Sequence, residues 1–247
     1  MSQNMRLAIL VTNTDQSSFA ERHPKDAEKF TDLIRLVRPN WQLSAFQVHM
    51  GEFPDDLERF DGAMITGSPT STRAGLPWIE QLLELIRGME RRKQPLFGAC
   101  FGHQACALAL GGKVSANPQG WVHGLVGNTL AGKSDWTGDL PGSFALYGSH
   151  CEHVSKLPER AVEMALSSGL NAGFRIDGHL WTSQHHPEMS HEFISALTGE
   201  MCDTLGQKAH DKALESLTKQ ADQAEFAECI ARFFEQATEL NASQGGA

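Results

Sequence analysis

The sequence predicts an α/β fold: a doubly wound, mostly parallel sheet with helices on both faces. Residues 6–13 and 61–66 are short, nearly continuous apolar runs, which is typical of parallel strands buried on both faces. Residues 25–37 and 78–89 repeat apolar side chains at the spacing of a helix. Strands and helices that alternate in this way indicate parallel strands joined by crossover helices.

The first half of the chain supplies these elements in order. We expect a strand, a loop, a helix, two further strands and a second helix over residues 6–13, 14–24, 25–37, 41–48, 61–66 and 78–89. The third strand runs directly into Gly67-Ser68-Pro69. That turn therefore lies at the carboxyl end of a parallel strand, the edge at which open α/β sheets bind ligands.

A strand–turn–helix signature is centred on Cys100. An apolar run ends there, Gly98 and Gly102 flank the cysteine as Gly-x-Cys-x-Gly, and apolar residues follow at helical spacing. This pattern predicts a nucleophile elbow, in which the glycines leave space where strand, turn and helix crowd together. The positive end of the helix would favour the nucleophilic thiolate. The alternative from this motif alone is a buried core cysteine.

A second polar segment lies far downstream. Residues 180–188 are typical of a strand that ends in His185-His186-Pro187-Glu188. Because side chains of an extended segment alternate, His186 and Glu188 point the same way. Glu188 can then hold one imidazole nitrogen while the other takes the proton of Cys100. The chain thus contains a candidate nucleophile, base and orienting acid in the order Cys, His, Glu.

The remaining segments are expected to extend the fold. They comprise additional strands and loops, two helices and a polar tail expected to be disordered, over residues 113–170, 189–205, 209–240 and 241–247. We predict one domain over residues 1–195 and a helical extension over 196–247 that packs on the same domain. The extension has a large apolar face, formed by Phe226, Ile230, Phe233 and Phe234. Each such side chain is costly to leave in water, by about 1.5–3 kcal/mol.

Bulk composition narrows the class of partner. The 247 residues carry 21 basic and 30 acidic side chains, a formal net charge of −9, so neither nucleic acid nor a membrane surface is expected as a partner. No secretory layout or transmembrane-length apolar run is present. The five cysteines are an odd number without a Cys-x-x-Cys, which suits a reducing compartment. We therefore expect a soluble, cytoplasmic protein.

Together the motifs resemble the class I, triad-type glutamine amidotransferase domain. The resemblance rests on four stretches in order, residues 65–69, 98–104, 147–154 and 184–188. It spans roughly residues 5–194 and is similar to the stand-alone glutaminase domain of GMP synthase and to γ-glutamyl peptidases. It implies a flavodoxin-like fold and cleavage of the γ-glutamyl amide of glutamine through a thioester, with release of ammonia.

The resemblance also implies further site residues. The implied oxyanion donors are the backbone N–H groups of Gly67, Ser68 and Phe101. The implied substrate-binding residues are Gln104, Ser149 and His150, near which the backbone would take the α-carboxylate of glutamine. Gly67-Ser68-Pro69 departs from the Gly-Gly-Pro frequent in the family, a change that backbone donation tolerates. The resemblance implies no metal or cofactor, and the sequence contains no ATP-binding signature.

Several alternatives remain at this point. The chain could be a free-standing γ-glutamyl peptidase acting on γ-glutamyl compounds, or a non-catalytic binding or regulatory protein on the same fold. A glutaminase would need an ammonia-accepting synthase as a partner. Phe101 argues against the related chaperone and intracellular-protease family, which has histidine directly after the cysteine. A metal site at His185, His186 and Glu188 lacks a spaced set of further ligands.

Overall fold

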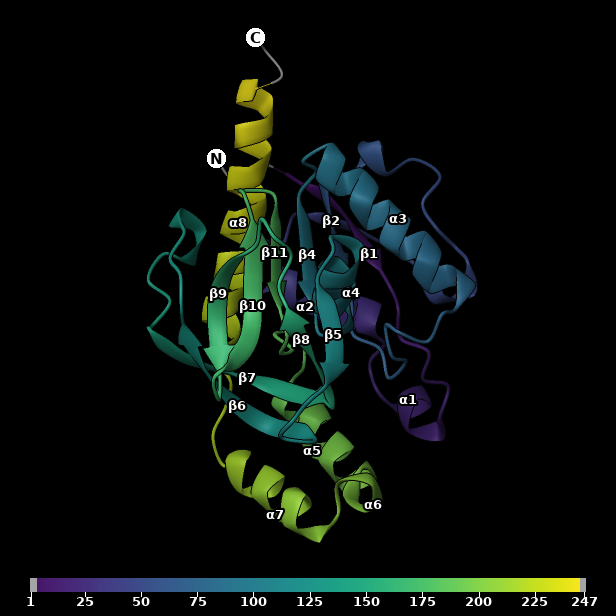
Figure 1. Ribbon diagram of the computed structural model, residues 1–247, viewed down its shortest axis with the longest axis vertical. Coiled ribbons are helices and arrows are strands. Elements are labelled where there is room, and N and C mark those ends of the chain that lie inside the picture. The colour runs from purple at the N-terminus through teal and green to yellow at the C-terminus, as the bar shows by residue number, and fades with distance from the viewer. Residues whose placement is uncertain (1–3, 245–247) are drawn as a thin grey trace.

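The computed structural model describes residues 4–244, of which residues 241–244 are described by their backbone alone, and its centre is a nine-stranded sheet (Figure 1). In chain order the strands of this sheet are β1 (Arg6–Leu10), β2 (Gln42–Phe46), β3 (Gly62–Ile65), β4 (Leu96–Ala99), β6 (Val122–Leu130), β7 (Ser143–His150), β9 (Val162–Ser167), β10 (Leu170–Ile176) and β11 (Leu180–Ser183). Their order across the sheet is β2-β1-β3-β4-β11-β10-β9-β6-β7. The strands from β2 to β11 pair in parallel and the rest pair antiparallel.

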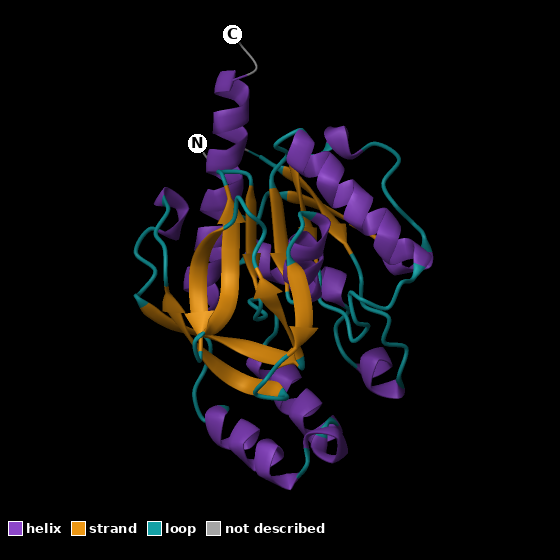
Figure 2. Ribbon diagram, in the orientation of Figure 1, coloured by secondary structure: helices purple, strands orange, loops and turns teal. Residues whose placement is uncertain are grey.

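Helices cover both faces of this sheet, as Figure 2 shows. The α-helices are α1 (Ser18–Arg22), α2 (Asp26–Arg35), α3 (Pro77–Arg91), α4 (Phe101–Ala109), α5 (His191–Glu200), α6 (Cys202–Leu205), α7 (Gln207–Ser216) and α8 (Gln223–Gln244). Three short 3-10 helices are η1 (Val48–Met50), η2 (Leu57–Arg59) and η3 (Asp135–Thr137). The strands β5 (Lys113–Ala116) and β8 (Glu152–Lys156) form a separate antiparallel pair. The predicted doubly wound fold is confirmed. Of its antiparallel strands, β6, β7 and β9 lie in the segment expected to carry extra strands, residues 113–170, whereas β10 begins at the last residue of that segment and continues to Ile176.

Strand β1 shows why the sheet is covered twice. Leu7 and Ile9 belong to a buried cluster with residues of α2 and α8, whereas Ala8 and Leu10 belong to a second cluster with residues of α3 and α4. Successive side chains of a strand point to opposite faces, so a strand between two helical layers must be apolar throughout. This burial on both faces explains the continuous apolar run of residues 6–13.

Helix α1 corrects the prediction of a loop over residues 14–24. The helix begins after Ser17, whose hydroxyl oxygen accepts a hydrogen bond from the backbone N–H of Ala20 at 3.2 Å. Such a side chain satisfies one of the free N–H groups of a first turn. With five residues and one buried apolar side chain, Phe19, the helix is too short to display an apolar period.

The C-terminal segment also differs from prediction. The helix expected over residues 209–240 is two helices, α7 and α8, because Asp222 is tied to the sheet. Its backbone N–H donates to the carbonyl of Ala145 at 2.9 Å, and its carboxylate accepts from the N–H of Ala145 at 2.7 Å. The expected helix over residues 189–205 is likewise divided at Met201 into α5 and α6. The prediction of a disordered tail from residue 241 is wrong for residues 241–244, which belong to α8. Residues 245–247 lie outside the described residues.

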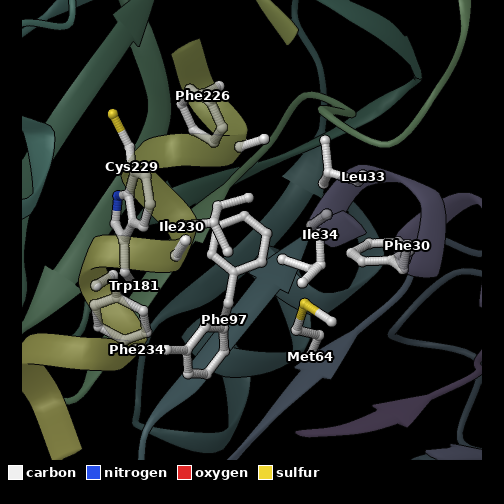
Figure 3. Packing of buried hydrophobic residues seen from close by; sticks show 14 of the residues in the cluster. Phe30, Leu33, Ile34, Met64, Phe97, Trp181, Phe226, Cys229, Ile230 and Phe234 are labelled. Carbon is white, nitrogen blue, oxygen red and sulfur yellow. The ribbon is translucent and has the colours of Figure 1, made fainter. Parts of the chain in front are cut away.

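Helix α8 supplies much of one core cluster. Phe226, Ile230, Phe233 and Phe234 are each at most 2% exposed. Figure 3 shows three of these side chains facing Phe97 of β4 and Trp181 of β11. The rings of Trp181 and Phe226 stack with centroids 5.0 Å apart. The apolar face of the extension is therefore covered by the chain's own core.

An ion-pair clamp holds the outer side of the same helix. Arg38 follows α2 and contacts Glu228 at 2.9 Å and Glu235 at 2.7 Å, two carboxylates about two turns apart on α8. The hydrogen bonds that Arg38 donates to these carboxylates raise the pKa of its guanidinium above the ordinary value. The pairing fixes the position of α8 along α2, because a planar guanidinium meets carboxylates in defined directions.

We expect Phe233→Ala to lower the free energy of unfolding by about 3–5 kcal/mol. The side chain is fully buried and its ring packs against Trp136 and Trp181, with centroids 5.5 and 5.9 Å away, so its removal leaves a cavity. Urea unfolding monitored by circular dichroism measures the change. Glu239→Ala, at an exposed position of the same helix, is the control and should alter stability by about 0.5 kcal/mol or less. Equal effects of the two substitutions would contradict the packing described.

Candidate active site

Cys100 stands at the turn between β4 and α4. Its backbone has φ 50° and ψ −100°, a left-handed conformation that is costly for a residue with a side chain. Two hydrogen bonds impose it: the N–H of Cys100 donates to the carbonyl of Ser183 at 2.8 Å, and its carbonyl accepts from the N–H of Gln104 at 3.1 Å. The predicted elbow is therefore present, with the thiol at the first turn of a helix.

Two glycines make this turn possible by close packing. A Cβ atom at Gly98 would lie 2.7 Å from the carbonyl of Gly102, and one at Gly102 would lie 2.7 Å from the carbonyl of Ile65. Real Cβ atoms do not approach backbone so closely, so both positions need glycine. The spacing Gly-x-Cys-x-Gly thus reflects contacts among β4, α4 and β3.

His186 and Glu188 form a buried pair beside the thiol. Their Nδ1 and Oε1 atoms are 2.7 Å apart, and each residue is 4% exposed. A Cβ atom built at Gly67 would lie 2.7 Å from Cε1 of His186 and 3.8 Å from Cβ of Cys100, which places all three residues together. Burial lowers the pKa of His186, but the charge of Glu188 and the charge and hydrogen bond of Cys100 outweigh it and raise the pKa well above its ordinary value. These surroundings favour the imidazolium form of His186.

The adjacent His185 faces a different part of the molecule. Its Nδ1 contacts the side-chain oxygen of Asn128 at 2.8 Å, and its ring lies 5.4 Å from that of His150. Burial lowers its pKa well below the ordinary value, so the ring is neutral at pH 7. Of the two neighbouring histidines, His186 is the one that lines the cavity at Cys100.

A cavity of about 650 Å³ opens in front of these side chains. Its inner wall is formed by Gly67, Ser68, Cys100, Ser149, His186 and Glu188. Its outer wall comes from α1, α2 and α5, with Trp121, which is 39% exposed, at one side. The chemistry-bearing residues therefore share one chamber with side chains of α1, α2 and α5.

Thr12 fixes the turn that was predicted to receive the oxyanion. Its hydroxyl lies 2.9 Å from the carbonyl oxygens of Thr66 and of Gly67, and its backbone N–H donates to the Thr66 hydroxyl at 3.0 Å. In a trans peptide the N–H points opposite to the C=O, so the N–H of Ser68 is directed away from Thr12. Sequence reasoning missed Thr12, because a threonine after a strand has many uses and its partner lies 54 residues away.

Comparison with known proteins decides the family. The family model described as glutamine amidotransferase class-I matches residues 34–195. The chain belongs to the class I glutamine amidotransferase family. The expectation of an enzyme of this hydrolytic family is confirmed.

The relatives of this amidotransferase include two kinds of protein. The chain is 30% identical to γ-glutamyl peptidase 3 of Arabidopsis thaliana over 90% of its own length and 93% of that protein's. It is 31% identical to one subunit of the glutamine-hydrolysing GMP synthase of Methanosarcina mazei, over 75% of this chain and 89% of that subunit. Among solved structures, a glutamine amidotransferase from Thermotoga maritima matches with a TM-score of 0.75 at 19% identity, over 96% and 99% of the two chains. The last likeness shows the shared fold.

The three predicted substrate-binding residues of the amidotransferase differ in their relation to the cavity at Cys100. Ser149 lines the cavity at Cys100. Gln104 instead donates from its amide to the backbone carbonyl of Glu152 at 3.2 Å and to the side-chain oxygen of Gln184 at 3.3 Å. His150 holds the same carbonyl through Nδ1 at 2.9 Å, and burial lowers its pKa to about 4. A direct substrate contact by either side chain therefore remains a prediction.

Among residues 4–244, no group of three or more His, Cys, Asp or Glu side chains is arranged to hold a metal ion. Within the same range, no helix has both the length and the apolar character required to cross a membrane. The five cysteines, all in that range, are free thiols.

Proposed function

We propose that this amidotransferase cleaves γ-glutamyl amides with a triad of Cys100, His186 and Glu188. The thiolate attacks the amide carbon, and the resulting oxyanion is received by backbone N–H groups of Gly67, Ser68 and Phe101. His186 protonates the departing ammonia or amine, which leaves a thioester on Cys100. The same imidazole then takes a proton from water as the water attacks the thioester, which releases the γ-carboxylate and restores the thiolate.

The observation that carries this proposal is the joint position of Cys100 and the His186–Glu188 pair. A carboxylate 2.7 Å from one imidazole nitrogen orients the other nitrogen and stabilises the imidazolium. The N–H of Phe101 is the first of α4, and the first N–H groups of a helix have no acceptor within that helix. They are thus suited to bind developing negative charge at the elbow.

The size of the cavity favours γ-glutamyl peptides as a second candidate substrate beside glutamine. Cavities of about 300–1,000 Å³ commonly hold drug-sized ligands. The chamber of about 650 Å³ continues past Cys100 to Lys29 of α2 and Phe193 of α5. This space can accept an amide substituent much larger than the single –NH₂ of glutamine. The similarity to γ-glutamyl peptidase 3 over most of both chains supports the same candidate.

The burial of α8 supports a self-sufficient enzyme. The apolar face that could have bound a synthase is covered by the chain's own core. The alternative is a glutaminase that delivers ammonia to a separate synthase. The free thiols support a reducing compartment, consistent with the proposed cytoplasmic location.

We expect the purified protein alone to hydrolyse glutamine or a small γ-glutamyl peptide. The experiment offers a panel of both and measures released ammonia, released amino acid and glutamate at steady state. Each substrate is also tested with added cell extract. Activity that requires the extract, with co-purification of a larger enzyme, would indicate a glutaminase that works only within a synthase complex. The complete lack of turnover under both conditions would favour a binding protein on this fold.

A further inference from the structure

Ser149 of β7 is linked to a short chain of polar groups that leads away from the catalytic cavity. Its hydroxyl lies 3.1 Å from Nδ1 of His123, its cross-strand partner on β6. The other nitrogen of that ring, Nε2, lies 3.0 Å from the hydroxyl of Thr198 on α5. That hydroxyl in turn donates to the backbone carbonyl of Ile194 at 2.7 Å.

The direction of these hydrogen bonds follows from the last acceptor in the series, the backbone carbonyl of Ile194. A threonine hydroxyl has one proton, and Thr198 gives it to the carbonyl of Ile194, which can only accept. Thr198 must therefore accept from His123, so the proton of the ring lies on Nε2. Burial, with a smaller contribution from two neighbouring histidines, lowers the pKa of His123 to about 4, so the ring is neutral at pH 7. Its Nδ1 is then an acceptor, and Ser149 must donate to it.

The consequence appears at the cavity wall. The proton of Ser149 is directed to His123, and its oxygen presents lone pairs to the cavity that contains Cys100. The sulfur of Met201, 3.6 Å away, is the other neighbour of this hydroxyl, but a thioether is a weaker acceptor than an imidazole nitrogen. The Ser149 hydroxyl can therefore only accept a hydrogen bond from a molecule bound in this cavity.

We propose that Ser149 accepts a hydrogen bond from the α-ammonium group of the γ-glutamyl substrate and that His123 is the positioning residue that orients it. This inference rests on the proposed function. The α-carbon of a γ-glutamyl group carries one carboxylate, which can only accept, and one ammonium, which can only donate. An oxygen that offers lone pairs selects the ammonium. Ser149 and His123 would therefore set specificity for a free α-amino group.

The test compares two substrates that differ in one group. γ-Glutamyl anilide carries the α-amino group and glutaryl anilide lacks it. We expect wild-type protein to cleave γ-glutamyl anilide with a kcat/KM roughly tenfold or more above that for glutaryl anilide. A hydrogen bond to a charged group contributes a free energy that corresponds to about this ratio. Ser149→Ala and His123→Phe should remove most of the preference, chiefly through KM, because the ammonium is bound alike in the ground and transition states.

Matched variants separate positioning from folding. His123→Asn can place an oxygen near the position of Nδ1 and should restore part of the preference, whereas His123→Phe should not. His153→Asn alters a buried histidine outside the catalytic cavity and should keep the wild-type preference. A wild-type protein that cleaves both anilides equally would overturn the inference. So would variants that lose activity on both in equal proportion, which is the result of a purely structural role.

Two further measurements do not depend on turnover. In protein labelled with ¹⁵N-histidine, a long-range ¹H–¹⁵N spectrum at pH 7 should show His123 protonated at Nε2, with the assignment made from His123→Asn; protonation at Nδ1 would refute the argument. Calorimetry with Cys100→Ala protein should show tighter binding of glutamine than of glutaramate, its analogue without the amino group. If neither glutamine nor any γ-glutamyl compound, the anilide included, is cleaved, the proposed function fails, and equal binding of glutamine and glutaramate would separately overturn the inference.

Discussion

Cys100→Ala is expected to lower hydrolysis of γ-glutamyl amides by about 10⁴-fold or more, because it removes the atom that forms the thioester. The fold should persist. The hydrogen bonds that shape the turn come from the backbone of Cys100, and the side chain that is lost faces the cavity. Steady-state rates and urea unfolding of the same preparation measure the two properties.

Cys106→Ala is the matched control. This thiol lies in the middle of α4, fully buried, and burial raises its pKa well above the ordinary value, so it stays protonated and inert. Its replacement should leave the rate within a few-fold of wild type. Appreciable turnover by Cys100→Ala, or a large loss in Cys106→Ala alone, would show that Cys100 is not the nucleophile.

His186→Ala should cost about as much as loss of the nucleophile, and Glu188→Gln should cost less, about 10²–10³-fold. The imidazole transfers the proton, whereas the carboxylate orients the ring and stabilises its charge. Because Glu188 raises the pKa of His186, the glutamine variant should also move the ionisation of the imidazolium to lower pH. Profiles of kcat/KM against pH measure both effects.

The neighbouring histidine tests the register of the triad. His185→Asn should retain activity, since that ring contacts Asn128 and not the cavity at Cys100. Loss of activity in His185→Asn with retention in His186→Ala would mean that the assignment is wrong by one residue.

The fold was predictable wherever local pattern and tertiary environment agree. The continuous apolar run of β1 reports burial on both faces of the sheet, and the helical period of α3 reports burial of one side of that helix. Helix α1 was not predicted, because its start depends on one capping hydroxyl, that of Ser17, and not on a repeat of apolar residues. The break between α7 and α8 was not predicted, because it depends on hydrogen bonds between Asp222 and Ala145, 77 residues away.

The site residues that could be predicted are those that lie in a local motif, and those that could not depend on contacts with distant segments. Cys100, His186 and Glu188 were identifiable because each lies in a motif whose spacing fixes its direction, and the structure brings them together. The direction of the Gln104 side chain was not predictable, since it depends on a carbonyl of β8. His123 gave no usable signal, because its role requires the register of β6 against β7, which no short motif specifies.

Helix α8 has a consequence for synthesis of the chain on the ribosome. The sheet face that contains Met64 and Phe97 is closed by side chains near Phe233, which are translated more than a hundred residues later. At ordinary elongation rates this interval is on the order of ten seconds. A nascent chain that already has its parallel strands thus carries a bare apolar face until its last long helix emerges, and a product truncated before residue 226 keeps that face open to chaperones and proteases.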